Sequence, residues 1–158
     1  MSDRTPPQRI VVGVDGSDSS RSALRWAARQ AVLTGAELRP VQAWRLPPTY
    51  GMPTDYSDAD FEGHARENLR RTVQDVLGEY PDLNVVPQVV EGHPATVLIE
   101  AARSADLLVV GSHGHGTFAG TLLGSVSQHC VHHATCPVLV VRAHDGRLPD
   151  VEAQADAD

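Results

Sequence analysis

The stretch LLVVGSHGHGTFAGTLLGS, from Leu107 to Ser125, decides the fold. Its apolar start is typical of a buried strand, and a helix is expected to begin at its end, at Gly124-Ser125. The loop between them contains Gly111, Gly114, Gly116 and Gly120. A strand, a glycine-rich loop and a helix N-terminus form an anion cradle, because glycine lets the backbone approach a phosphate and the first helical N–H groups point at it.

The order of these glycines excludes two common nucleotide-binding motifs. GSHGHG reads G-x-x-G-x-G, whereas the dinucleotide fingerprint is G-x-G-x-x-G. A Walker A loop needs a lysine that reaches the phosphates, but all 13 Lys and Arg residues of this chain are arginine. The pattern that remains is Gly111-x2-Gly114-x9-Gly124-Ser125.

This pattern resembles the ATP-binding members of the universal stress protein family, whose motif is G-x2-G-x9-G-[S/T]. The spacing matches in full, and the resemblance extends from about Arg9 to Arg142. The resemblance implies a cytoplasmic regulatory protein that binds ATP and takes part in a stress response.

Five short apolar segments alternate with helical patterns, which is typical of repeated βα units and a parallel sheet. The predicted strands are Ile10–Val14, Glu37–Trp44, Asn84–Val90, Asp106–Val110 and Pro137–Val141, and the predicted helices begin near Ser17, Ala59, Pro94 and Ser125. Since Pro87 cannot donate to a ladder, the third strand is expected at an edge. We expect an α/β, doubly wound, flavodoxin-like or Rossmann-like parallel sheet. The resemblance implies the strand order 3-2-1-4-5.

Length and composition favour one soluble domain. The chain has 158 residues, of which 41 % are hydrophobic, and a net charge of −7, which counts against sequence-independent binding of nucleic acid. We expect a domain at 9–142, with a disordered N-terminus at 1–8 and an acidic, disordered tail at 143–158. The apolar runs are too short to cross a membrane, and no secretory leader is visible, so a cytoplasmic protein is expected.

The nucleoside end of the site is predicted at the end of the first strand. Neighbouring strands 1 and 4 form the switch point where ligands bind in doubly wound sheets, so Asp15 is expected beside Gly111. A carboxylate there can accept hydrogen bonds from ribose hydroxyls or an adenine amine, although an ordinary helix cap is the alternative interpretation of Asp15. The resemblance adds Gly13 and Val14 to this segment. It also assigns to the Val41 backbone the recognition of the adenine edge.

The phosphate end is predicted in the glycine loop and the helix that follows. Gly111, Gly114 and Gly124 would let backbone N–H groups reach the phosphates, although ordinary turn chemistry also uses glycine. Ser125 is expected to cap the helix and to donate its hydroxyl to a phosphate oxygen, and Ser127 to donate a second hydroxyl. Val126 is expected to contribute a backbone amide at the helix start.

The histidines are candidates for contact with phosphates or for binding a metal ion. His113 and His115 lie inside the cradle and are expected to be exposed loop residues, while the spacing of His129, His132 and His133 places them near one another on the last helix. No further ligand completes a metal site there, so exposed surface histidines are the favoured interpretation.

Charge balance indicates the cofactor. An acidic chain without lysine that binds ATP needs bound Mg²⁺ or Mn²⁺ to offset the phosphates, so metal-dependent ATP binding is expected. The alternatives are a slow ATPase or autophosphorylating enzyme, and a dimerisation module of the same fold that binds no nucleotide. The resemblance implies a homodimer through the fifth strand, whose apolar edge, Val138 to Val141, needs protection.

Overall fold

A computed structural model describes residues 8–53, 55–56, 59–113 and 123–142. The terminal segments expected to be disordered lie outside these ranges, apart from Gln8. Five parallel strands form one sheet in the order β3-β2-β1-β4-β5, so the expected α/β fold and strand order are confirmed. The strands are β1 (Arg9–Gly13), β2 (Glu37–Trp44), β3 (Gln88–Glu91), β4 (Leu107–Gly111) and β5 (Val138–Val141).

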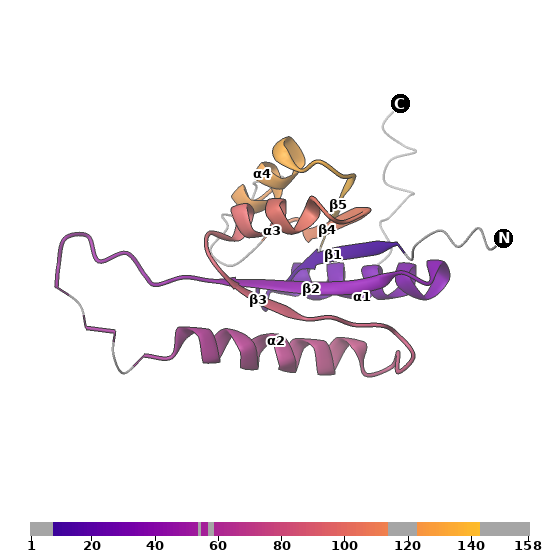
Figure 1. The fold of residues 1–158 in the computed structure, drawn as a ribbon, viewed down its shortest axis with the longest axis horizontal. Helices are drawn as coiled ribbons and strands as arrows, with labels where there is room; N and C mark the ends of the chain where they lie inside the picture. The colour runs from indigo at the N-terminus through magenta and orange to yellow at the C-terminus, as the bar shows by residue number, and fades with distance from the viewer. Residues whose placement is uncertain (1–7, 54, 57–58, 114–122, 143–158) are drawn as a thin grey trace, which may run out of the picture.

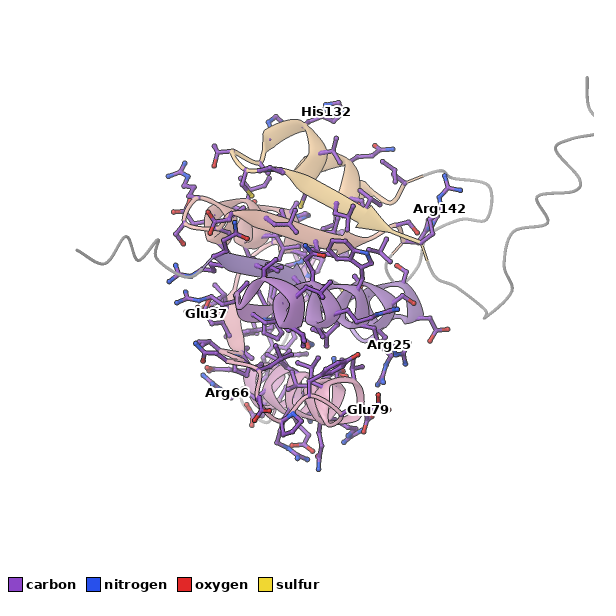
Figure 2. All side chains as sticks on the ribbon, turned by 90° about the vertical axis from the view of Figure 1, so that its right-hand side faces the viewer. Arg25, Glu37, Arg66, Glu79, His132 and Arg142 are labelled. Carbon is purple, nitrogen blue, oxygen red and sulfur yellow. The ribbon has the colours of Figure 1, made fainter. Side chains whose placement is uncertain are left out.

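Helices cover both faces of the sheet. The helices α1 (Asp18–Thr34) and α2 (Phe61–Leu77) lie on one face, and α3 (Pro94–Ala102) and α4 (Ser125–His133) lie on the other (Figure 1). Each face has its own core: Leu24 of α1 and Leu69 of α2 belong to one cluster, and Leu98 of α3 and Cys130 of α4 to the other. The charged side chains of Arg25 in α1, Arg66 in α2 and Glu79, two residues after α2, point outward (Figure 2).

The helix bounds follow from local chemistry. Ser17 caps α1, because its side chain accepts a hydrogen bond from the backbone N–H of Ser20. Gly35 ends α1 in the left-handed conformation at φ 73°, which glycine adopts without strain. The helix α2 begins two residues later than expected, because Asp60 acts as its N-cap and accepts from Gly63 N–H.

The third strand is shorter than the sequence predicts. We expected a strand from Asn84 to Val90, but β3 begins at Gln88 and is preceded only by an isolated bridge between Val85 and Leu38 of β2. Val86 N–H donates to the Leu38 carbonyl, so the nitrogen of the next residue, Pro87, faces away from β2. Pro40 in β2 lacks the N–H group that would donate to the Val86 carbonyl, so the ladder is interrupted there. The edge position expected for this strand is confirmed.

The topology places a switch point between β1 and β4. From β1 the chain crosses to β2, and from β4 it crosses in the opposite direction to β5, so the connections diverge at the carboxyl ends of these two strands. Ligands bind at such points in open α/β sheets. Among the described residues, no helix has both the length and the apolar character that spanning a membrane requires.

Candidate functional site

A pocket of about 250 Å³ lies at this switch point, at the carboxyl ends of β1 and β4. A cavity of this size lies just below the usual range of small-molecule sites, roughly 300–1,000 Å³. The lining residues come from β1, β2, β4 and the starts of three helices: Gly13, Val14, Asp15, Ser17, Ser20, Val41, Ala43, Pro94, Leu98, Val110, Gly111, His113, Gly124, Ser125, Val126 and Ser127.

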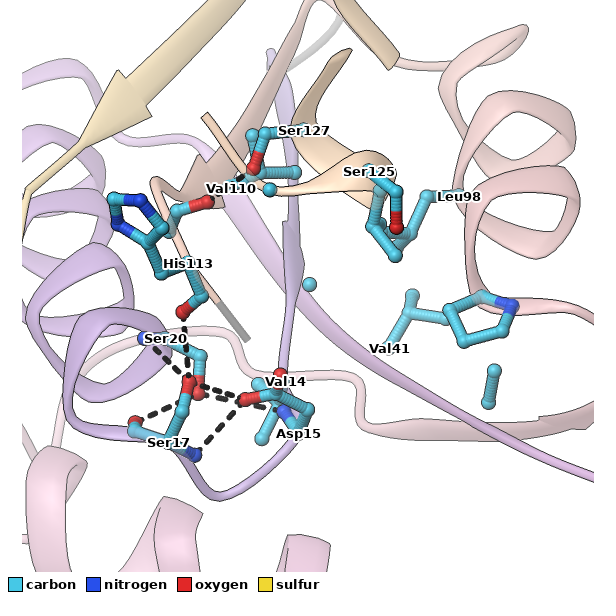
Figure 3. A pocket seen from close by; sticks show the side chains of 16 residues that line it. Val14, Asp15, Ser17, Ser20, Val41, Leu98, Val110, His113, Ser125 and Ser127 are labelled. Carbon is cyan, nitrogen blue, oxygen red and sulfur yellow. Dashed lines mark hydrogen bonds between the residues drawn. The ribbon is translucent and has the colours of Figure 1, made fainter. Parts of the chain in front are cut away.

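Nine of the ten residues that the sequence analysis selected for nucleotide binding line this one pocket: Gly13, Val14, Asp15, Val41, Gly111, Gly124, Ser125, Val126 and Ser127. The tenth, Gly114, lies outside the described residues, as does His115. Figure 3 shows Asp15 beside Ser17 and Ser20 on one side of the pocket, and Ser125 and Ser127 on the opposite side. The pocket thus has two polar ends.

A network of serines organises the Asp15 end. Asp15 Oδ1 accepts hydrogen bonds from both the backbone N–H and the hydroxyl of Ser17, the first at 2.9 Å. Ser20 Oγ accepts from Asp15 N–H at 3.3 Å and donates to the Ser17 carbonyl at 3.0 Å. The helix cap of α1 is therefore Ser17, and Asp15, which is exposed, faces the pocket with its carboxylate oriented by Ser17.

The start of α4 forms the opposite end. Gly124 is the N-cap of this helix and makes no side-chain capping bond. Ser125, which we expected to act as the cap, is instead the first helical residue and is exposed to the pocket. Since the first N–H groups of a helix have no partner within it, an uncapped N-terminus that faces a pocket is suited to bind an anion.

Ser127 joins α4 to the sheet. Its side chain is 3 % exposed, and its hydroxyl donates to the Gly111 carbonyl at 2.6 Å. A hydroxyl has one proton to donate. Ser127 donates it to the Gly111 carbonyl and not, as we expected, to a phosphate. The backbone N–H of Gly124 adds a second tie, to the Ser112 carbonyl at 2.7 Å.

Gly111 allows a helix to approach the end of β4. A Cβ atom added at this position would lie 2.2 Å from Ser19 Oγ and 2.8 Å from Ser20 N. The glycine at 111 is thus explained by the packing of α1 against β4, which is a different reason from the phosphate contact that the motif predicts. A Cβ atom at Gly13 would meet only the flexible end of Leu98, at 2.8 Å.

The wall between the two polar ends is apolar. Val41 of β2 is 1 % exposed and Leu98 of α3 is 5 % exposed, and Pro94 and Ala43 line the same side. The Val41 carbonyl accepts a hydrogen bond from Val14 N–H at 2.9 Å, which fixes the end of β1 against β2. Apolar surfaces of this kind suit an aromatic base.

Sequence reasoning missed several of these residues. Leu98 and Ala43 carry no signal in the sequence beyond their apolar character, and only the three-dimensional packing brings them to the pocket. Ser19 and Ser20 carried one available signal, the polar run Ser17-Asp18-Ser19-Ser20, which begins four residues after the end of the buried strand β1. Both serines are at most 4 % exposed, so each needs a hydrogen-bond partner.

Charge is sparse in the pocket. Its described lining contains one carboxylate, Asp15, one imidazole, His113, and no lysine or arginine. His113 Nδ1 lies 3.1 Å from the Ser112 hydroxyl. Behind the pocket wall, burial in the core raises the pKa of the Cys130 thiol to about 11, so this thiol is protonated at neutral pH.

The histidines of α4 lie close together but form no recognisable metal centre. The ring centroids of His129 and His133 are 6.2 Å apart, and those of His132 and His133 are 6.4 Å apart. His129 Nδ1 lies 2.8 Å from the Ser125 carbonyl, one turn earlier. Within the described part of the chain, no group of three or more His, Cys, Asp or Glu residues could hold a metal ion.

Comparison with known proteins places the chain in a family. The sequence profile described as "Universal stress protein family" matches residues 7–142. The chain belongs to the universal stress protein family. A universal stress protein of Mycolicibacterium smegmatis (strain ATCC 700084 / mc(2)155) is 38 % identical over 152 residues, covering 89 % of this chain and 51 % of the relative. The chain spans about half the length of the curated relatives it matches.

Solved universal stress protein structures share the fold and include nucleotide complexes. One, described as a universal stress protein in complex with cAMP, is 33 % identical and superposes with a TM-score of 0.64, covering 87 % of this chain and 98 % of that chain. Another, from Archaeoglobus fulgidus in complex with dAMP, is 26 % identical with a TM-score of 0.62, covering 85 % of this chain and 97 % of that chain.

Proposed function

We propose that this chain binds ATP, together with Mg²⁺ or Mn²⁺, and acts as a cytoplasmic regulatory protein in a stress response. The observation that carries the proposal is the pocket itself. An acceptor for a nucleoside, Asp15, and an uncapped helix N-terminus for phosphates, at Ser125, face one cavity across an apolar wall. Adenine nucleotides in two related structures, cAMP and dAMP, support the same class of ligand.

The protein would supply only part of the coordination of the divalent metal. Mg²⁺ is usually held by one or two carboxylates together with substrate phosphates and water. The described lining offers one carboxylate, Asp15, and one exposed hydroxyl at the phosphate end, Ser125. These groups fit a metal carried mainly by the ligand's phosphates, and the metal would supply the positive charge that the lining lacks.

Regulation rather than turnover is the proposed role of the nucleotide. Fast phosphoryl transfer needs a group that positions the attacking nucleophile and cations that stabilise charge at the γ-phosphate. In the described lining the candidates for the first task are His113 and Asp15, which is assigned to the nucleoside, and no lysine or arginine supplies the second. A steady-state ATPase rate above about 1 s⁻¹, the low end for kinases, would favour the enzyme alternative.

A homodimer through β5 is part of the proposal. This strand is the last of the described sheet, and its four residues are half-buried and apolar. An apolar edge strand is a site for pairing with another chain, and pairing with its own copy would close a symmetric dimer. Sedimentation should report a dimer that Leu139→Lys converts to a monomer, whereas a monomeric wild-type protein would contradict this assembly.

Ser125→Asp tests the phosphate end most selectively. The new carboxylate would sit at the first turn of α4, where it stabilises the helix through its dipole but repels a phosphate. Calorimetry should therefore show ATP affinity lowered by at least tenfold, with adenosine affinity and thermal stability nearly unchanged.

Gln128→Asp is the matched control, because it adds the same charge to the same helical turn at an exposed position outside the pocket lining. We expect this variant to bind ATP within about threefold of wild type, as a single surface charge is worth about 0.3–1 kcal/mol. Equal losses in the two variants would mean that α4 does not hold the phosphates.

A further inference from the structure

Ser19 makes a double contact with the start of the glycine loop. Its hydroxyl donates to the His113 carbonyl at 2.6 Å, and its oxygen accepts from the His113 backbone N–H at 3.2 Å. The side chain comes from the first turn of α1 and is 4 % exposed. One buried hydroxyl thus satisfies both backbone groups of a residue 94 positions away in the sequence.

The segment Gly111–His113 connects the two helix N-termini that face the pocket. On one side, Ser19 ties His113 to α1. On the other, Gly124 N–H and the Ser127 hydroxyl tie α4 to the Ser112 and Gly111 carbonyls, at 2.7 and 2.6 Å. The three residues of this segment therefore link the position of α4 to that of α1.

The serines at the start of α1, Ser17, Ser19 and Ser20, divide into two groups by what they hold. Ser17 and Ser20 bond to Asp15 and to each other, so they orient the proposed nucleoside end. The two short bonds to His113 come from Ser19, and Ser17 adds only a long contact of 3.5 Å. Removing the Ser19 hydroxyl would release the connecting segment and leave the bonds to Asp15 in place.

We infer that Ser19 is a positioning residue that sets how strongly this site prefers a nucleotide over a nucleoside. The inference rests on the proposed function, because it assigns the phosphate end to α4. With Ser19 in place, the uncapped start of α4 is held at a fixed separation from Asp15, so phosphates and nucleoside are bound together. Preorganised sites gain affinity because less ordering is needed on binding.

Ser19→Ala tests this assignment with two ligands. Calorimetry should show ATP binding weakened about tenfold to thirtyfold, the effect of losing two neutral hydrogen bonds, and adenosine binding weakened less than about twofold. Ser22→Ala is the matched control, since Ser22 lies on the same helix and its side chain makes no hydrogen bond within the described part of the chain. It should leave both affinities unchanged.

Amide hydrogen exchange provides a readout that needs no ligand. In the free protein, Ser19→Ala should raise exchange at the His113 amide about tenfold, while Ser22→Ala leaves it unchanged, because that amide donates to Ser19 Oγ. Unchanged exchange at the His113 amide, or equal losses of ATP and adenosine affinity, would overturn the inference about Ser19 but not the proposed function. If the wild-type chain binds neither ligand, the proposed function is overturned, and the phosphate preference assigned to Ser19 with it.

Discussion

Replacing Gly111 with alanine should destabilise this fold far more than a single methyl group normally does. The added Cβ would lie 2.2 Å from Ser19 Oγ, 2.7 Å from the Ser19 carbonyl carbon and 2.8 Å from Ser20 N. Two of these three atoms belong to the backbone of α1, so the helix itself must move. Overpacking in a core costs about 1–3 kcal/mol, and we expect a loss near the upper end, about 3 kcal/mol.

The assay is urea unfolding of Gly111→Ala beside Gly13→Ala. Both glycines end strands at the pocket, but the Cβ atom of the second variant meets only the flexible end of Leu98, so its cost should stay below about 1 kcal/mol. In thermal unfolding, about 3 kcal/mol corresponds to a decrease in Tm of roughly 6–12 °C for a domain of this size. Equal stability losses in the two variants, or a loss under about 0.5 kcal/mol for Gly111→Ala, would refute this packing argument.

Three further predictions concern the site and its supports. Ser127→Ala should lower the free energy of unfolding by about 1–2 kcal/mol, because the Gly111 carbonyl loses its buried donor; wild-type stability in urea would contradict this. Burial raises the pKa of Cys130 to about 11, whereas an unfolded thiol ionises near pH 8.5. Raising the pH from about 8.5 to 11 should therefore ionise this thiol in the unfolded chain first and lower the free energy of unfolding. Cys130→Ala should remove that part of the pH slope, and an unaltered slope would show that this thiol does not cause it. Asp15→Asn should weaken adenosine binding about tenfold in calorimetry while stability changes by less than about 1 kcal/mol, since its Oδ1 acceptor remains for Ser17; an unchanged affinity would remove Asp15 from the ligand site.

The sequence predicted the sheet well, because its five apolar segments and their helical connections are local patterns. The strand order came from the family resemblance, and the structure confirms it. The limits of β3 were wrong, because the interruption depends on Pro40 in the neighbouring strand β2, a relation that no local pattern contains.

The sequence predicted which residues line the candidate site, but not what each of them does there. The glycine spacing and the switch point brought nine selected residues to one pocket. The close approach of α1 that requires Gly111, the structural bond of Ser127 and the contact of Ser19 with His113 each depend on how a helix packs on the sheet. Tertiary packing decides such contacts. Without it, the sequence motif assigned Gly111 and Ser127 to the ligand, although both have structural roles.

Calorimetric titration of ATP into the wild-type chain, with and without Mg²⁺, tests the central claim most directly. We predict saturable binding of one ATP per chain, with lower affinity when a chelator removes the divalent metal. Absence of saturable binding under both conditions would contradict the claim that this pocket is a nucleotide site.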